Sequence, residues 1–254
     1  MTQTTTDDRT LTDRALAASA DRVLSAARAM DRPHRLDADL AVVWQSRHGF
    51  FTNAAYVLAE PSDWRDVLAR VGDVIPEGPP ITLISAASTP DLEGDGWHLV
   101  GHPPLMVRLP GGDGPAPPQE LSICAATTEP ELEVFERTLI DCYPDPSLQP
   151  YEWGSVHDGR ALAGATRFLI GSVAGRPVAT ATGHVADGLN VVEMVATADD
   201  ARGRGYGAAL TWAATTVDPA LPAVLIASDL GRSVYEALGF VAVSRWTIWH
   251  RPAT

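Results

Sequence analysis

The sequence contains no lysine, so all 19 of its basic residues are arginine. This absence excludes chemistry that depends on a lysine side chain, such as the lysine-containing phosphate loop and the Schiff base that pyridoxal phosphate forms. Only two cysteines occur, Cys124 and Cys142, and nothing requires that they pair. No apolar run is long enough to span a membrane, and residues 1–15 lack the apolar core of a signal peptide. We therefore expect a reduced, cytoplasmic protein.

The charge balance argues against a second group of functions. The 254 residues carry a formal net charge of −13. A protein that binds nucleic acid through its phosphates needs a basic surface, so a nucleic-acid partner is not expected. The seven histidines show no spacing typical of metal ligands, and we expect no metal. A hydrophobic content of 45% allows a normal buried core, and the length suits one large domain or two small ones.

Hydrophobic periodicity and turn signals predict a chain in which helices and strands are mixed, as in α/β and α+β proteins. Helices are expected at 12–30, 64–74, 129–142, 206–216 and 233–238. Strands are expected at 40–44, 54–58, 81–85, 99–109, 121–125, 168–173, 177–185, 189–197, 223–227 and 241–249, with the segment 99–109 interrupted by Pro103 and Pro104. The segment 110–120 is rich in glycine and proline, which indicates a linker.

A weak internal repeat relates the two halves of the chain. The segment PPITLIS from Pro79 matches PAVLIAS from Pro222, and the segment that begins at Gly96 matches the one that begins at Gly239. Both pairs are 143 residues apart, and this shared offset favours two related halves over a chance likeness. We expect an N-terminal domain over residues 1–115 and a C-terminal domain over residues 116–254.

The stretch RGRGYGA at 202–208 lies between the strand expected at 189–197 and the helix expected at 206–216. A helix N-terminus carries unpaired N–H groups and a partial positive charge, and glycines let a ligand approach those amides closely. A phosphate or pyrophosphate is the ligand that such a loop favours. A plain exposed turn would also use glycine, so the loop alone does not distinguish an anion-binding site from a turn. The first half of the chain has AEPSDW at the matching place and lacks such a loop.

The residues around the loop resemble motif A of the GNAT superfamily of acyl-CoA-dependent N-acyltransferases, whose signature R/Q-x-x-G-x-G/A lies at a strand-to-helix turn. Here that signature runs from Arg202 to Gly207 and follows MVAT, while SDLGRSVYEALGF from Ser228 is similar to the family's second motif. The resemblance covers roughly the C-terminal half of the chain. It implies a mixed, mostly antiparallel sheet flanked by helices, and with the repeat it suggests a degenerate GNAT-like copy in the N-terminal half.

The resemblance also implies acetyl-CoA as the acyl donor and indicates which residues would bind it. Backbone groups of Val195 and Thr197 would pair with the pantetheine arm, and the amides of 203–208 would bind the pyrophosphate. Ser228 departs from the family, which often has a longer asparagine there. The residues expected to bind the donor are Val195, Ala196, Thr197, Arg202, Gly203, Arg204, Gly205, Tyr206, Gly207, Ala208 and Ser228.

Acyl transfer to an amine needs a base for the amine and an acid for the leaving thiolate. The resemblance implies Tyr235 as the acid, and as the base an acidic residue on the strand before the loop, here Glu193. His184, on a neighbouring strand, is a second candidate base. Each residue could instead be structural, because Tyr235 could face a core with Leu238 and Glu193 could lie on the exposed side of a strand.

These inferences favour an N-acetyltransferase that takes acyl-CoA and an amine in a ternary complex, as a monomer or homodimer. A module that binds acyl-CoA without chemistry is the main alternative, although a pure binder has no need of Tyr235 and Glu193. Aminoacyl transfer from tRNA on a similar twin-domain fold is a third possibility, which the acidic charge opposes. The acceptor stays open between a small amine, an amino acid, an antibiotic and a protein N-terminus, and Trp153 could line its pocket.

Overall fold

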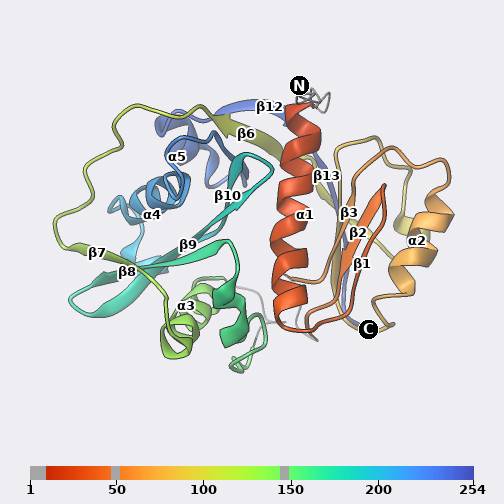
Figure 1. The fold of residues 1–254 in the computed structure, drawn as a ribbon, viewed down its shortest axis with the longest axis horizontal. Helices are drawn as coiled ribbons and strands as arrows, with labels where there is room; N and C mark the ends of the chain where they lie inside the picture. Colours follow the sequence, from red (N-terminus) through yellow and green to blue (C-terminus); the bar gives the residue numbers. More distant parts are fainter. Residues whose placement is uncertain (1–9, 47–51, 144–148) are drawn as a thin grey trace, which may run out of the picture.

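The computed structural model describes residues 10–46, 52–143 and 149–254, so most of the polar N-terminal segment lies outside the described residues. The chain forms two β-sheets, and the long helix α1 (Leu11–Ala29) lies between them in the view of Figure 1. Both sheets are mostly antiparallel, and helices cover their faces. This architecture confirms the mixed α+β class expected from the sequence.

The first sheet has six strands. Helix α1 covers one face, packing against Tyr56 and Ile84, and α2 (Trp64–Gly72) covers the other through Val67 and Val71. Among the strand pairs of this sheet in the described residues, only β3 and β4 run parallel to each other. In spatial order the strands are β1 (His34–Leu36), β2 (Leu40–Val43), β3 (Ala54–Val57), β4 (Ile81–Ser85), β13 (Thr247–Arg251) and β5 (His98–Gly101).

In the part of the chain that the structure describes, the second sheet has seven strands, and only its β10–β11 pair is parallel. Helix α4 (Tyr206–Thr215) packs on one face against Leu169, and α3 (Glu129–Cys142) packs on the other against Phe168. Helix α5 (Arg232–Ala237) packs beside α4. In spatial order the strands are β12 (Val241–Arg245), β6 (Pro104–Arg108), β11 (Ala223–Ile226), β10 (Leu189–Thr197), β9 (Arg176–Ala186), β8 (Thr166–Val173) and β7 (Leu121–Ala125).

Each sheet contains one strand from the other half of the chain. Strand β6 pairs with β11 and β12 of the second half, and β13 pairs with β4 and β5 of the first half. The strands that cross over belong to the segments that the internal repeat matches, β5–β6 after Gly96 and β12–β13 after Gly239. The boundary expected at residue 115 falls between β6 and β7, and neither side of it builds its sheet alone.

The exchange explains one difference from the expected strands. A single strand over 241–249 is wrong, because the chain leaves the second sheet after Arg245 and enters the first sheet at Thr247. Trp246, between these strands, is fully buried, and its backbone N–H donates to the carbonyl of Pro103 at 3.1 Å. The two segments in which the chain passes from one sheet to the other are therefore hydrogen-bonded to each other. Strand β1 was not expected, because three residues with little burial leave no hydrophobic pattern.

Helix α1 carries residues of the first half to the second sheet. It begins at a capping box, in which Thr10 and Asp13 bond each other's backbone N–H groups. Its buried face is rich in alanine and packs against strands of both sheets. The same face includes Arg22, which is only 5% exposed. A buried arginine requires a partner, because an unpaired charge in the interior is costly.

Candidate functional site

Strand β10 parts from its neighbour β11 immediately after Val191, where the parallel ladder between them ends. On its other edge β10 stays paired with β9, but the register shifts between Glu193 and Ala196, and Met194 has a positive φ of 51°. A bulge of this kind bends and twists a strand. The two strands therefore open into a wedge beside Glu193.

Two threonines on β9 hold the bulge in place. The Thr180 hydroxyl donates to the carbonyl of Met194 at 2.9 Å, and the Thr182 hydroxyl donates to the carbonyl of Glu193 at 3.0 Å. Both threonines are fully buried. Since water cannot reach these carbonyls from the β9 side, the side-chain bonds satisfy groups that the shifted ladder leaves without a strand partner.

A cavity of about 270 Å³ lies in the wedge. Side chains from α1, from both sheets and from α5 line it. It contains Glu193 and Tyr235, the two residues expected to be catalytic, together with Val195 and Ser228 of the expected donor site. Most of the lining is apolar. Its polar residues are Ser19, Arg22, Tyr56, Thr82, Tyr143, Glu193, Ser228 and Tyr235.

Tyr235 is held on the short helix α5 and is 8% exposed. Its ring meets that of Phe240 edge to face, with centroids 6.2 Å apart. Burial raises the pKa of Tyr235 to about 12, and the nearby Tyr143 adds to the rise. The hydroxyl therefore keeps its proton at neutral pH, as a proton donor must. The amide of Gly231 donates to the Ser228 hydroxyl oxygen at 3.2 Å, which ties the start of this turn together.

Glu193 forms an ion pair with Arg22 of α1. The side chain of Arg22 is 6% exposed and that of Glu193 is 22% exposed, so the pair lies at the cavity wall with its carboxylate partly open. The hydroxyl of Tyr56 also lies within hydrogen-bonding reach of Arg22. Burial raises the pKa of Tyr56. A residue of the first half thus fixes the carboxylate expected to act as base.

His184 is placed differently. It is fully buried, and it does not line the cavity. Its Nε2 lies 3.0 Å from a carboxylate oxygen of Asp21 on α1, and its Nδ1 lies 2.9 Å from the hydroxyl of Thr166. The pKa of Asp21 is lowered, chiefly by the hydrogen bond with His184. Both ring nitrogens are therefore engaged: Nε2 joins the second sheet to α1, and Nδ1 contacts the neighbouring strand β8 within that sheet.

Sequence reasoning missed Arg22, Tyr56 and Tyr143 as lining residues. Arg22 carried a signal, because it follows Ala15 and Ala18 at the helical spacing of the buried face of α1. The two tyrosines carried none, since they come from β3 and from the end of α3, far from Glu193 in the sequence.

The glycine loop leads into α4 as expected. Gly205 is the N-cap of the helix with φ of 82°, and Gly203 has φ of 76°, a backbone region that favours glycine. No side chain caps this helix end, so its first amides have no partner within the helix. A Cβ on Gly207 would lie 3.1 Å from the hydroxyl oxygen of Thr197, which shows how closely α4 approaches the end of β10.

Side chains of the loop are largely engaged with neighbours. Arg202 pairs with Asp199 at 2.7 Å and also donates to the carbonyl of Thr197 at 3.1 Å. The buried Tyr206 donates to a carboxylate oxygen of Glu120 in the linker at 2.8 Å. These contacts leave the backbone amides as the groups that the loop presents, with Arg204 exposed beside them.

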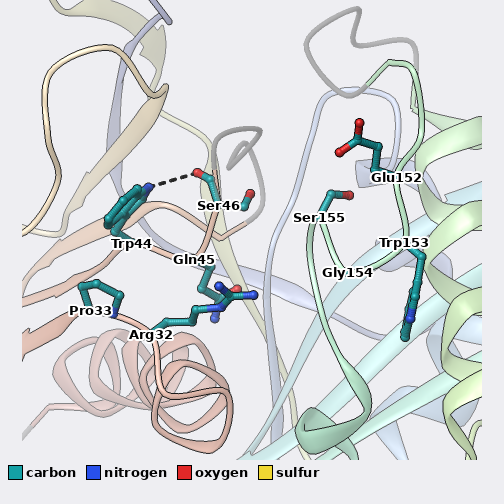
Figure 2. Close-up of a pocket in the computed structure, with 9 residues that line it drawn as sticks. All are labelled: Arg32, Pro33, Trp44, Gln45, Ser46, Glu152, Trp153, Gly154 and Ser155. Carbon is teal, nitrogen blue, oxygen red and sulfur yellow. Dashed lines mark hydrogen bonds between the residues drawn. The ribbon is translucent and has the colours of Figure 1, made fainter.

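A second cavity, of about 300 Å³, contains Trp153. Figure 2 shows Trp153 and Glu152 on one side of it and Trp44 on the other, with Arg32 and Gln45 between them. Glu193 and Tyr235 do not line this cavity. Trp153 therefore belongs to a separate hollow between the two halves of the chain.

In residues 10–46, 52–143 and 149–254, no group of three or more His, Cys, Asp or Glu side chains is placed to hold a metal ion. Over the same ranges, no helix combines the length and the apolar character that crossing a membrane would require.

Solved structures with a similar fold cover almost the whole chain. A GCN5-related N-acetyltransferase from Kribbella flavida is 21% identical with a TM-score of 0.68, and the match covers 96% of each chain. A putative acetyltransferase of the GNAT family from Novosphingobium aromaticivorans is 17% identical with a TM-score of 0.60, over 94% of this chain and 99% of that one. A GCN5-related N-acetyltransferase from Sphaerobacter thermophilus is 15% identical with a TM-score of 0.52, over 95% of each chain. No protein-family model and no curated protein matches the sequence.

Proposed function

We propose that this chain, which has the fold of the GCN5-related N-acetyltransferases, transfers an acetyl or short acyl group from acyl-CoA to an amine in a ternary complex. One observation carries the proposal. The cavity between the parted strands holds a buried tyrosine and a carboxylate, and β10, which lines it, leads into a glycine loop and an uncapped helix. A proton donor, a base and an anion-binding terminus are the groups that this reaction needs.

The residues around the loop fit the donor. The amides of 203–208 would hold the pyrophosphate, because the turn at Gly203 has open space on the side where a Cβ would lie. Val195 and Thr197 would offer backbone groups to pantetheine along the edge of β10 that β11 leaves. Ser228, at the cavity beside Tyr235, would contact the same arm. Bound acyl-CoA supplies the activated thioester.

The residues of the cavity would then divide the chemistry. Glu193 takes the proton that the acceptor nitrogen loses, directly or through a water molecule, as the C–N bond forms. A backbone N–H near Val195 stabilises the oxyanion. Tyr235 gives its proton to the sulfur as the C–S bond breaks. Glu193 is better placed than His184 for the first role, because His184 is buried outside the cavity.

The second candidate function, a module that binds acyl-CoA without chemistry, needs only the loop and the edge of β10. It does not account for an ion pair at the cavity wall in which the arginine is almost completely removed from water, at a cost in desolvation. Measured transfer from acetyl-CoA to any amine would exclude it.

We expect full-length protein to bind one acetyl-CoA per chain. The first half has no glycine loop, and α2 starts differently from α4: the side chain of its N-cap, Asp63, accepts a hydrogen bond from the amide of Arg65 at 2.9 Å. A carboxylate at that helix start repels a phosphate. Titration calorimetry with acetyl-CoA measures the stoichiometry. Two molecules per chain would contradict the assignment to α4 alone, and no binding would refute the proposed function.

We expect Glu193→Gln to lower turnover by about 10²-fold near neutral pH, at the lower end of what loss of a general base costs. Glutamine keeps the shape of the side chain but cannot take the proton. The loss should shrink at high pH, where more of the amine is already neutral. A pH–rate profile with a fixed acceptor measures this. Glu133→Gln, which removes an exposed Glu–Arg pair on α3, serves as the control. An equal loss at every pH would instead indicate a structural role.

A further inference from the structure

Arg22 and Glu193 are the only charged side chains among the described residues that line the central cavity. They come from opposite halves of the chain and form an ion pair. The wall around them includes Ala54, Ile84 and Ile248 of the first sheet, which are apolar. The cavity thus presents one positive and one negative group side by side against a hydrocarbon surface.

The proposed reaction disturbs this pair. When Glu193 takes the amine proton, its negative charge is neutralised while Arg22 stays charged. Arg22 is 5% exposed, so only a group inside the cavity can take the place of the lost partner, and neutral water there does not restore the missing negative charge. Leaving a buried charge without a counter-ion is strongly destabilising. A simple amine as acceptor offers nothing to offset this cost, whereas a substrate that carries its own carboxylate keeps Arg22 paired during the transfer.

We propose that the acceptor is an α-amino acid with an uncharged, apolar side chain, an inference that rests on the proposed function. Its carboxylate joins Arg22, and its amino group faces Glu193. Guanidinium has several N–H donors, so Arg22 can receive a carboxylate while it keeps its existing partners. The amino and carboxylate groups of such a substrate are attached to one carbon atom. Their short separation matches that of Glu193 and Arg22, which are in direct contact. The side chain packs on the wall formed by Ala54, Ile84 and Ile248.

The same observations exclude related substrates. An acidic amino acid would bring a second carboxylate, and a basic one a second cation, and no further charged lining residue is present in the described chain to pair with either. The free-energy cost of burying an unpaired charge would exceed the gain from packing against the apolar wall. Amines without a carboxylate fit the wall but leave Arg22 to lose its counter-ion in the reaction.

The test compares each amino acid with the amine that remains when its carboxylate is removed. Alanine, valine, leucine and phenylalanine are assayed with acetyl-CoA against ethylamine, isobutylamine, isopentylamine and phenethylamine, and aspartate and arginine serve as charged controls. We expect kcat/KM for the preferred apolar amino acid to exceed that of its matched amine at least tenfold. A charge-assisted bidentate contact justifies a preference of this order.

Variants of Arg22 test whether this residue causes the preference for amino acids over their matched amines. Arg22→Gln should raise KM for the amino acid about tenfold or more relative to its matched amine, and Arg22→Lys should restore part of the difference. Each pair is compared within one variant, so a general loss of activity cancels from the ratio. The comparison on unmodified protein needs no variant, which keeps the proposal testable if Arg22→Gln does not fold.

The outcomes separate the two proposals. Acetylation of the amines at equal or higher kcat/KM than the amino acids would overturn the inference and leave the acetyltransferase in place. If acetyl-CoA does not bind, the proposed function fails, and calorimetry with the amino acids alone then decides whether the cavity binds them. No heat of binding in that experiment would overturn the inference as well.

Discussion

Tyr235→Phe should lower turnover by about 10³-fold and leave the affinity for acetyl-CoA unchanged, within the usual effect of removing a general acid. Phenylalanine keeps the ring and its contact with Phe240, so only the proton donor is lost. The thiolate must then leave without a proton. Steady-state kinetics gives the turnover number, and calorimetry gives the affinity of the same preparation.

Tyr143→Phe is the matched control. Tyr143 lines the same cavity, and burial also raises its pKa, with a further contribution from Glu193. Because Tyr143 is not the proposed acid, its loss should change turnover little. A large loss in Tyr143→Phe alone would reassign the acid to that residue. Full turnover in Tyr235→Phe, with chemistry shown to limit the rate, would mean that Tyr235 only packs.

Gly205→Val should abolish measurable acetyl-CoA binding while the protein stays folded. Gly205 is the N-cap of α4 at φ of 82°, where a β-branched residue is strained by roughly 1–2 kcal/mol. The position is exposed, and a Cβ there would lie 3.5 Å from Pro118, so the core is not disturbed. The valine side chain would instead cover the amides that receive the pyrophosphate. Titration calorimetry measures the loss.

Gly96→Val controls for strain. Gly96 has the same φ of 82°, nothing lies within 4 Å of the place its Cβ would take, and it precedes a strand of the first sheet. Both variants should therefore lose similar stability in thermal unfolding, but only Gly205→Val should lose the ligand. Normal acetyl-CoA affinity in Gly205→Val would place the pyrophosphate elsewhere. Equal loss of affinity in both would indicate general destabilisation.

Much of the fold could be predicted because it depends on neighbours in the sequence. The helix expected at 12–30 forms at Leu11–Ala29, and the helix expected at 129–142 forms at Glu129–Cys142, each behind a capping box. These elements follow from hydrophobic periodicity and local capping, which act within a few residues. The loop at 202–208 could be predicted for the same reason, because its glycines determine the backbone conformation of a single turn.

The sequence by itself determined the local devices, namely the glycine loop, the helix that starts there, and a tyrosine and a glutamate on elements near it. Only the tertiary structure decided what meets Glu193 and where each sheet obtains its strands. The Arg22–Glu193 pair, the Asp21–His184 contact and the exchange of β6 and β13 join segments more than a hundred residues apart. Such contacts result from packing two sheets against one helix, and because many pairings satisfy the same hydrophobic pattern, no local pattern specifies the one that forms.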